Sequence, residues 1–111
     1  MPDRPLLVCI LLLACALGSA APSAADPMAA PRARELERLV RQDCGSCHGM
    51  TLKGGLGPDI RAGRLAGTDP ASLAAIILDG VPGKPMPPWR PLLSESDALW
   101  IANYLLTETM P

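Results

Sequence analysis

The sequence predicts an all-α fold, with three to four short helices joined by loops in a single domain, and three observations lead to this prediction. Apolar residues recur at helical spacing in three segments, and no strand-like alternation extends beyond a few residues. Thirteen prolines and ten glycines lie mostly between those segments, where they favour loops. The chain of 111 residues has two Trp, one Tyr and no Phe, so we expect a bound group or a cross-link to complete a thin core.

The N-terminal segment is predicted to be an export signal. Residues 6–17 read LLVCILLLACAL, an uncharged apolar run that follows an arginine and precedes the small residues 18–21. The run is too short for a transmembrane helix, which needs ~20 apolar residues. We therefore expect residues 1–25 to be a signal peptide, cut near residues 20–25, leaving a periplasmic protein with no membrane span. A lipoprotein signal that anchors the chain through Cys15 is the alternative.

A short tail and an amphipathic helix are expected next. Residues 26–31, DPMAAP, are small or proline, and we expect this tail to be mobile. Within residues 32–43, Leu36, Leu39 and Val40 recur at i, i+3 and i+4, with charged residues around them. This pattern predicts a helix with a narrow apolar stripe that packs on a partner helix.

A glycine-rich loop over residues 49–67 separates this helix from the next one. Asp69 and Pro70 form a helix start, with Asp69 as the N-cap and proline at the first helical position. Gly80 is a typical C-terminal stop. Residues 81–91 contain five prolines, which predicts a stiff, extended loop.

The last predicted helix begins with a capping box made by Ser94 and Asp97. Residues 98–106 are apolar except at Asn103, so we expect this helix to be buried on more than one side. Three short helices supply too little apolar surface to cover it. We therefore expect an apolar group other than protein inside the fold.

Residues 44–48 read Cys-Gly-Ser-Cys-His, the C-x-x-C-H pattern of covalent c-type haem attachment. Removal of the signal would leave Cys44 and Cys47 as the only cysteines of the mature chain. Residues three and four apart share a face of a helical turn, so two thiols can reach two vinyl groups on one haem edge while His48 binds the iron. The pattern predicts one haem c, attached through Cys44 and Cys47 and ligated by His48.

Three other interpretations of the motif compete with haem attachment. A structural zinc site needs four ligands, and the mature chain offers only two cysteines and one histidine. A thioredoxin-like redox pair needs an α/β scaffold, and no strands are predicted. A plain disulfide across two intervening residues would close a small loop and stabilise little.

A second iron ligand is expected from methionine, because the only histidine is already used. Met28 lies in the tail, Met50 follows His48 too closely to reach the opposite haem face, and Met110 is the penultimate residue. Met86 lies in the segment Gly-Lys-Pro-Met-Pro-Pro-Trp, where the prolines make a rigid loop. Elimination and context therefore favour Met86.

The mature chain resembles the class I cytochromes c. The resemblance covers residues 32–107 and rests on the helix that ends in C-x-x-C-H, the following Gly-Pro, the Met-Pro loop and a final helix with a Tyr-Leu pair. It implies a cytochrome c domain over residues 32–111, wrapped around one covalent haem. Such a protein transfers electrons and is not an enzyme.

The same resemblance assigns further residues to the haem pocket. It implies that the carbonyl of Pro58 accepts a hydrogen bond from Nδ1 of His48, which fixes the imidazole tautomer. It implies that Leu105 touches the haem and that Trp89 lines the haem edge, where its indole N–H could meet a propionate. Trp100 and Tyr104 would pack on the first helix and hold the pocket closed.

A narrower resemblance, over residues 39–58 and 82–94, is to the cytochrome c55X (NirC) group, which travels with cytochrome cd1 nitrite reductase. It implies a periplasmic one-electron carrier whose partner is that reductase or a d1 haem maturation protein. The alternatives are a redox role in d1 haem maturation and, less favoured, a haem gas sensor. The net charge of −1 argues against a nucleic-acid partner.

Overall fold

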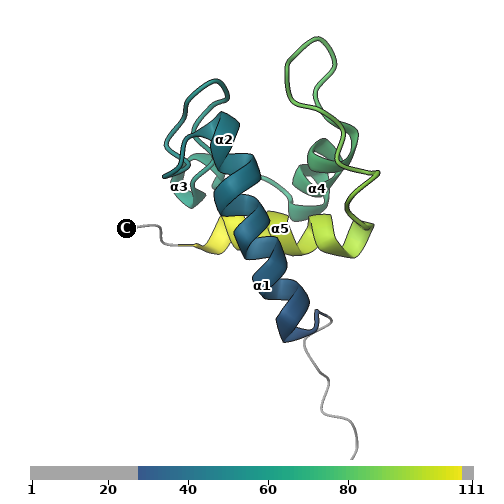
Figure 1. Cartoon of the computed structure of the whole chain (residues 1–111). Helices are drawn as coiled ribbons and strands as arrows, with labels where there is room; N and C mark the ends of the chain where they lie inside the picture. Colours follow the sequence, from purple (N-terminus) through teal and green to yellow (C-terminus); the bar gives the residue numbers. More distant parts are fainter. Residues whose placement is uncertain (1–27, 109–111) are drawn as a thin grey trace, which may run out of the picture.

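The computed structural model describes residues 28–108. Helical segments α1 (Ala30–Leu39), η1 (Val40–Cys44) and α2 (Gly45–His48) follow one another without a break and form one rod (Figure 1). The short helix α3 (Ala62–Leu65), then α4 (Pro70–Asp79) and α5 (Glu95–Thr107) complete the domain. Residues 28–108 contain no strand, so the all-α prediction is confirmed.

The first helix begins earlier than expected. Ala30 and Pro31, assigned to a mobile tail on composition, form the first turn of α1. Proline suits this position because the first turn of a helix needs no partner for its backbone N–H. The predicted signal peptide, its cut and the alternative lipid anchor at Cys15 all lie outside the described residues.

Helix α1 leads into the C-x-x-C-H motif through a π-helical turn. The sequence predicted an ordinary α-helix up to residue 43. Instead, residues 40–44 form one turn of π-helix, η1, in which the backbone hydrogen bonds span five residues rather than four. Cys44 is its last residue, and Cys47 and His48 then lie on α2. The motif is therefore carried on the end of a long, rigid element.

The predicted ends of α4 and α5 are confirmed by their caps. The carboxylate of Asp69 accepts a hydrogen bond of 2.8 Å from the backbone N–H of Ser72. Gly80 ends α4 at φ 70°, and a Cβ there would lie 2.8 Å from the carbonyl oxygen of Met86. Ser94 and Asp97 form the reciprocal capping box at the start of α5. The one-turn helix α3 falls in the segment predicted to be loop.

The core lies where α1, η1 and α4 pack on α5. Leu36 and Val40 are fully buried there, as the apolar stripe predicted, together with Ala98 and Ile101 of α5. Another face of α5 is only partly covered by residues 28–108, since Leu99 is 42% exposed. Among residues 28–108, none of the helices has the length and apolar character needed to cross a membrane.

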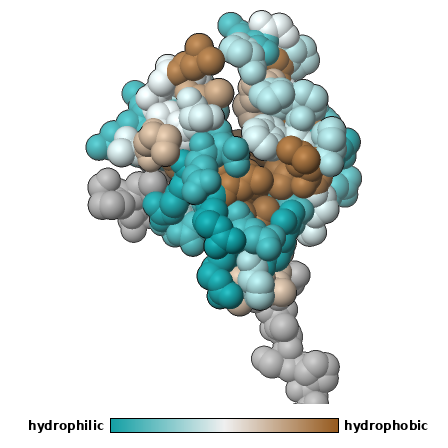
Figure 2. Space-filling view, viewed as in Figure 1, coloured by the Kyte–Doolittle hydropathy of each residue, from teal (hydrophilic) through white to brown (hydrophobic). Residues whose placement is uncertain are grey.

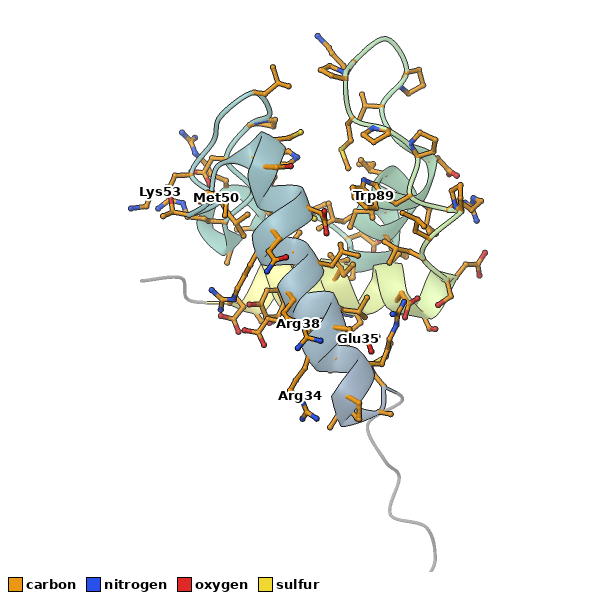
Figure 3. All side chains as sticks on the ribbon, in the orientation of Figure 1. Arg34, Glu35, Arg38, Met50, Lys53 and Trp89 are labelled. Atoms are coloured by element: carbon orange, nitrogen blue, oxygen red, sulfur yellow. The ribbon has the colours of Figure 1, made fainter. Side chains whose placement is uncertain are left out.

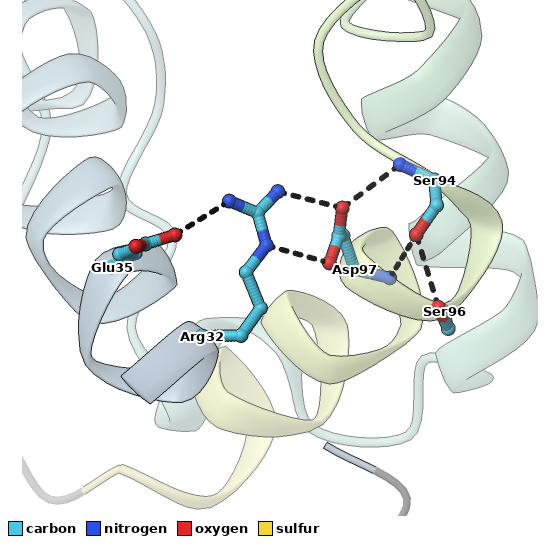
Figure 4. Close-up of polar contacts among 5 residues, drawn as sticks. All are labelled: Arg32, Glu35, Ser94, Ser96 and Asp97. Carbon is cyan, nitrogen blue, oxygen red and sulfur yellow. Dashed lines mark hydrogen bonds and ion pairs between the residues drawn. The ribbon is translucent and has the colours of Figure 1, made fainter. Parts of the chain in front are cut away.

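An ion pair joins the starts of α1 and α5 (Figure 4). The guanidinium of Arg32 contacts both carboxylate oxygens of Asp97, with Nε–Oδ1 3.1 Å and Nη2–Oδ2 2.8 Å. Asp97 is buried, and the same carboxylate accepts a hydrogen bond from the backbone N–H of Ser94. Two-point contact with arginine is among the stronger ion-pair geometries. One side chain thus caps α5 and fixes α1 against it.

Replacing this carboxylate should destabilise the domain measurably. We expect Asp97→Ala to lower the free energy of unfolding by ~3 kcal/mol, because it removes the carboxylate half of the capping box and the charge-assisted hydrogen bonds from Arg32 together. Denaturant unfolding followed by circular dichroism measures the change. Asp79→Ala is the matched control, because the Asp79–Arg90 pair is exposed and should contribute ~0.5 kcal/mol. Equal losses in the two variants would contradict the assignment.

The contribution of Asp97 to the free energy of unfolding should also depend on pH. The hydrogen bonds from Arg32, and then those from Ser94, lower the pKa of Asp97 to about 2, although burial opposes them. An aspartate in an unfolded chain titrates near ~3.9. The stabilisation is therefore complete above that pH and is lost as the pH falls towards 2. The difference in stability between wild type and Asp97→Ala should shrink over this window.

Candidate functional site

A deep cleft of about 540 Å³ opens between the two lobes of the domain. In Figure 2 it is the hollow near the middle of the molecule, with apolar side chains exposed on its floor. One lobe contains α2 and the loop that follows it, and the other contains α4 and the proline-rich loop (Figure 1). Most of its lining is aliphatic: Leu39, Leu65, Leu73, Ile77, Ile101 and Leu105. An apolar, bowl-shaped space of this size is suited to a flat organic group.

One wall of the cleft is formed by the C-x-x-C-H motif. Cys44, Cys47 and His48 all line the cleft, because η1 and α2 carry them on one face. Nδ1 of His48 lies 2.7 Å from the carbonyl oxygen of Pro58. A carbonyl only accepts hydrogen bonds, so Nδ1 carries the proton and Nε2 keeps a free lone pair. This is the tautomer in which Nε2 can ligate a metal.

Gly57 also shapes this wall, although sequence analysis did not single it out. A Cβ at Gly57 would lie 2.7 Å from both Nδ1 and Cε1 of His48, which is too close for any side chain. The backbone N–H of Gly57 donates a 2.8 Å hydrogen bond to the carbonyl of Cys47. The loop backbone therefore lies directly against the imidazole ring. The Gly-Pro pair in the sequence was the available signal.

Met86 lines the cleft from the opposite lobe. It is partly buried and belongs to the predicted proline-rich loop, which is closed by one internal hydrogen bond and tied to α4 by another. The N–H of Val81 donates to the carbonyl of Met86 at 3.2 Å, and the N–H of Trp89 donates to the carbonyl of Ile77 at 3.2 Å. A thioether and an imidazole thus face the same cleft from different elements.

The other methionines lie elsewhere in the described structure. Met50 is 67% exposed and does not line the cleft. Met28 packs against the core beside Trp100, in a separate groove along α5. Met110 lies outside the described residues. Of the methionines in residues 28–108, Met86 alone contributes to the cleft.

The two cysteines are free thiols in a partly buried environment. Burial, assisted by the negative charge of Asp43, raises the pKa of Cys44 to about 11. The Cys44 thiol is therefore protonated at neutral pH in the metal-free chain. Within residues 28–108 no three His, Cys, Asp or Glu side chains cluster to hold a metal ion. The zinc interpretation has no support in the structure.

The remaining predicted pocket residues divide between the cleft and the core. Trp89 and Leu105 line the cleft, and Trp89 lies beside α4 in Figure 3. Trp100 and Tyr104 stack on each other with ring centroids 5.1 Å apart, and they pack against the core from the far side of α5. The hydroxyl of Tyr104 accepts a 3.3 Å hydrogen bond from Arg41 of η1. Tyr104 thus joins α5 to η1, and neither aromatic residue lines the cleft.

The loop after α2 lies beside the cleft, and one of its apolar side chains is buried. Leu52 is buried, with 1% of its surface exposed, and its backbone adopts φ 58°. It points into the core and cannot contribute to a docking face. The exposed apolar residues at the mouth are Leu56, 75% exposed, and Ile76, 44% exposed. Nothing in the sequence indicates Leu56, because a single apolar residue in a loop gives no periodic signal.

The residues present fit an iron porphyrin. The cleft is apolar and open at one edge, a histidine with an available Nε2 lines one wall, and a methionine lines the other. Nitrogen and thioether sulfur are ligands suited to haem iron. The two thiols of the C-x-x-C-H motif also lie in the same wall as the histidine.

Comparisons with known proteins agree with this geometry. A family model described as cytochrome c oxidase, cbb3-type, subunit III matches residues 31–105. Cytochrome c55X of Paracoccus denitrificans (strain Pd 1222) is 58% identical over 100 residues, which are 89% of this chain and 94% of the relative. The solved structure of the c-type cytochrome NirC aligns with a TM-score of 0.69 and 48% identity, over 71% of this chain and 93% of NirC.

A second solved structure is similar over part of its length. Dihydro-haem d1 dehydrogenase NirN, solved in complex with DHE, aligns with a TM-score of 0.60 and 33% identity. The match covers 66% of this chain and 16% of NirN. This chain is therefore similar to one small portion of that larger protein.

The family match spans most of the folded domain, and cytochrome c55X matches over nearly its whole length. The cytochrome c55X and NirC relatives are electron carriers rather than enzymes. The fold, the cleft and these relatives lead to one conclusion: the chain belongs to the class I c-type cytochromes, within the cytochrome c55X/NirC group, and is an electron carrier of the haem c type.

Proposed function

We propose that this protein is an exported cytochrome that holds one covalent haem and carries single electrons within the system of cytochrome cd1 nitrite reductase. Cys44 and Cys47 would attach the haem, and His48 and Met86 would ligate its iron. Haem bound in this way supplies one iron centre that takes up and gives up one electron. The observation that carries the proposal is the joint lining of one apolar cleft by His48 and Met86.

The chain's own residues would keep this chemistry to electron transfer. The hydrogen bond to Pro58 holds the imidazole of His48 in place, and the proline-rich loop holds Met86 on the other side of the cleft. If both residues ligated the iron, no position on it would remain for a substrate. Aliphatic walls such as Leu105 exclude water, and methionine ligation together with burial favours the ferrous state. Trp89 would close one edge of the pocket.

The location and partner rest on other features. Residues 1–25 have the composition of an export signal, which supports a periplasmic protein, with lipid attachment at Cys15 as the alternative. Similarity to NirC and to part of the d1 dehydrogenase NirN supports a partner in the nitrite reductase and d1 haem system. The partner would be the reductase itself or a d1 haem maturation protein.

Intact mass tests the attachment directly. Protein expressed with an export signal and a haem-ligation system should exceed the mass of the processed polypeptide by one haem, because thioether bonds survive denaturation. The same spectrum reports where the signal is cut and whether a lipid is present. A mass equal to the bare processed chain would refute covalent attachment.

A deletion strain separates the two roles within the proposed system. Electron delivery predicts that the strain makes complete nitrite reductase, loaded with d1 haem, that turns over slowly in the periplasm. A maturation role predicts that the reductase lacks d1 haem. Normal reductase content and normal nitrite turnover would contradict both roles while leaving the electron-carrier assignment intact.

A further inference from the structure

The carbonyl of Pro58 is the atom that orients His48, and the loop around it holds this carbonyl from both sides. Before it, the N–H of Gly57 donates to the carbonyl of Cys47 at 2.8 Å. After it, the N–H of Ile60 donates to the carbonyl of Leu52 at 3.0 Å. Two peptide units lie between these bonds. The first, from Gly57 to Pro58, is held by a 2.9 Å hydrogen bond from the N–H of Gly55 to the carbonyl of Gly57, and the second, from Pro58 to Asp59, is left to other contacts.

Asp59 supplies those contacts through its side chain. Its Oδ1 accepts hydrogen bonds from the backbone N–H and from Nε of Arg61, both at 3.0 Å. Its Oδ2 accepts from Nη2 of Arg61 at 2.7 Å. The carboxylate is mostly buried, with 13% of the side chain exposed, and Arg64 approaches it only to 3.8 Å without a hydrogen bond. We call Asp59 and Arg61 the Asp59–Arg61 clamp.

The clamp acts on the Pro58 carbonyl because a peptide unit is a rigid plane. The carbonyl oxygen of Pro58 and the backbone nitrogen of Asp59 belong to the same plane, so fixing Asp59 limits rotation of that carbonyl. The side chain of Asp59 is tied to its own loop by three donors of Arg61, and it cannot turn without breaking them. The pair thus lies one residue from the His48 hydrogen bond, but touches neither the imidazole nor the cleft.

We propose that Asp59 and Arg61 are positioning residues that hold the Pro58 carbonyl on Nδ1 of His48 and thereby set the basicity of the imidazole that ligates the haem iron. This inference rests on the proposed function, in which His48 binds iron. A firm hydrogen bond at Nδ1 makes the imidazole a stronger donor, which favours ferric iron. A loosened clamp weakens that bond and raises the reduction potential.

Charge and positioning make opposite predictions for one variant. Arg61→Gln removes a positive charge, which by Coulomb interaction alone favours ferric iron and lowers the potential. The same variant removes two of the three donors of the clamp, which by the proposal raises the potential. Arg64→Gln is the matched control, because Arg64 offers the same charge beside the same carboxylate and makes no hydrogen bond to it.

The experiment uses the haem-loaded protein and two readouts. The first is the solvent exchange rate of the His48 Nδ1 proton in the ferrous state, measured by nuclear magnetic resonance. The second is the reduction potential, measured by voltammetry. We expect exchange to be roughly three- to ten-fold faster in Asp59→Ala and in Arg61→Gln, which corresponds to the loss of about one hydrogen bond. Arg64→Gln should exchange at the wild-type rate.

The potentials decide between positioning and charge. A potential of Arg61→Gln above that of Arg64→Gln supports the clamp. A potential equal to or below that of Arg64→Gln, or wild-type exchange rates in both clamp variants, overturns it. Absence of a haem-shifted Nδ1 proton in the wild type itself would instead refute the proposed ligation by His48, and the inference with it.

Discussion

The double variant Cys44→Ala, Cys47→Ala, prepared without haem, is expected to be largely disordered. The described core contains twelve buried hydrophobic residues, and several of them, including Leu73, Ile77 and Leu105, also line the cleft. Full burial of one such side chain contributes ~1.5–3 kcal/mol. Loss of apolar contact for several of them together is comparable to the ~5–15 kcal/mol that stabilises a whole domain. The haem is thus expected to be part of the core.

Amide dispersion in a nuclear magnetic resonance spectrum, together with helical circular dichroism, measures this result. Ser46→Ala is the matched control in the same motif, because it keeps both thiols and loses only an exposed hydrogen bond to the carbonyl of Asp43. It should take up haem and fold. Sharp, dispersed resonances from the haem-free double variant would show that the protein core is sufficient alone.

Met86→Ala should abolish the near-infrared sulfur-to-iron band of the ferric protein and lower the reduction potential. Met86 is the only methionine among residues 28–108 that lines the cleft, so no described thioether can replace it. Axial ligands set haem potentials over a range of ~0.8 V, and thioether ligation lies on the high side. We expect the band to disappear completely rather than to weaken. Ferrous Met86→Ala should also bind carbon monoxide readily.

The control for this experiment is Met50→Ala. Met50 is 67% exposed on the loop after α2, on the opposite side from Trp89 in Figure 3, and its removal should leave the band and the potential unchanged. Loss of the band in Met50→Ala would show that the ligand was assigned to the wrong methionine. A wild-type ferrous spectrum that shifts at once under carbon monoxide would favour the gas-sensor alternative.

Features that depend on neighbouring residues in the sequence were predictable. Asp69, Ser94 and Asp97 cap their helices as expected, because capping is decided within one helical turn. The members of the C-x-x-C-H motif meet on one wall because their spacing matches a helical turn. Met86 was selected by elimination, and the cleft contains it.

Features that depend on packing between distant segments were not predictable. Leu52 lies in a glycine-rich loop, yet it is buried with a left-handed backbone because other elements close over it. The salt bridge between Arg32 and Asp97 joins residues 65 apart, and no local pattern indicates it. The Asp59–Arg61 clamp is local, but its meaning depends on the contact of Pro58 with His48. Sequence analysis therefore identified the residues that line the cleft more readily than the residues that support them.

The π-helical turn η1 limits which mutations the chain can tolerate. Each residue of an α-helix advances the direction of its side chain by ~100°, and a π turn takes one residue more to complete a revolution. The five residues Val40–Cys44 thus set the rotational phase between the face that enters the core and the face that holds the C-x-x-C-H motif. Exchange of the exposed residues 41–43 leaves that phase unchanged, whereas insertion or deletion of one residue would turn the motif away from the cleft by ~100°. The length of this segment, more than its composition, is what the fold must preserve.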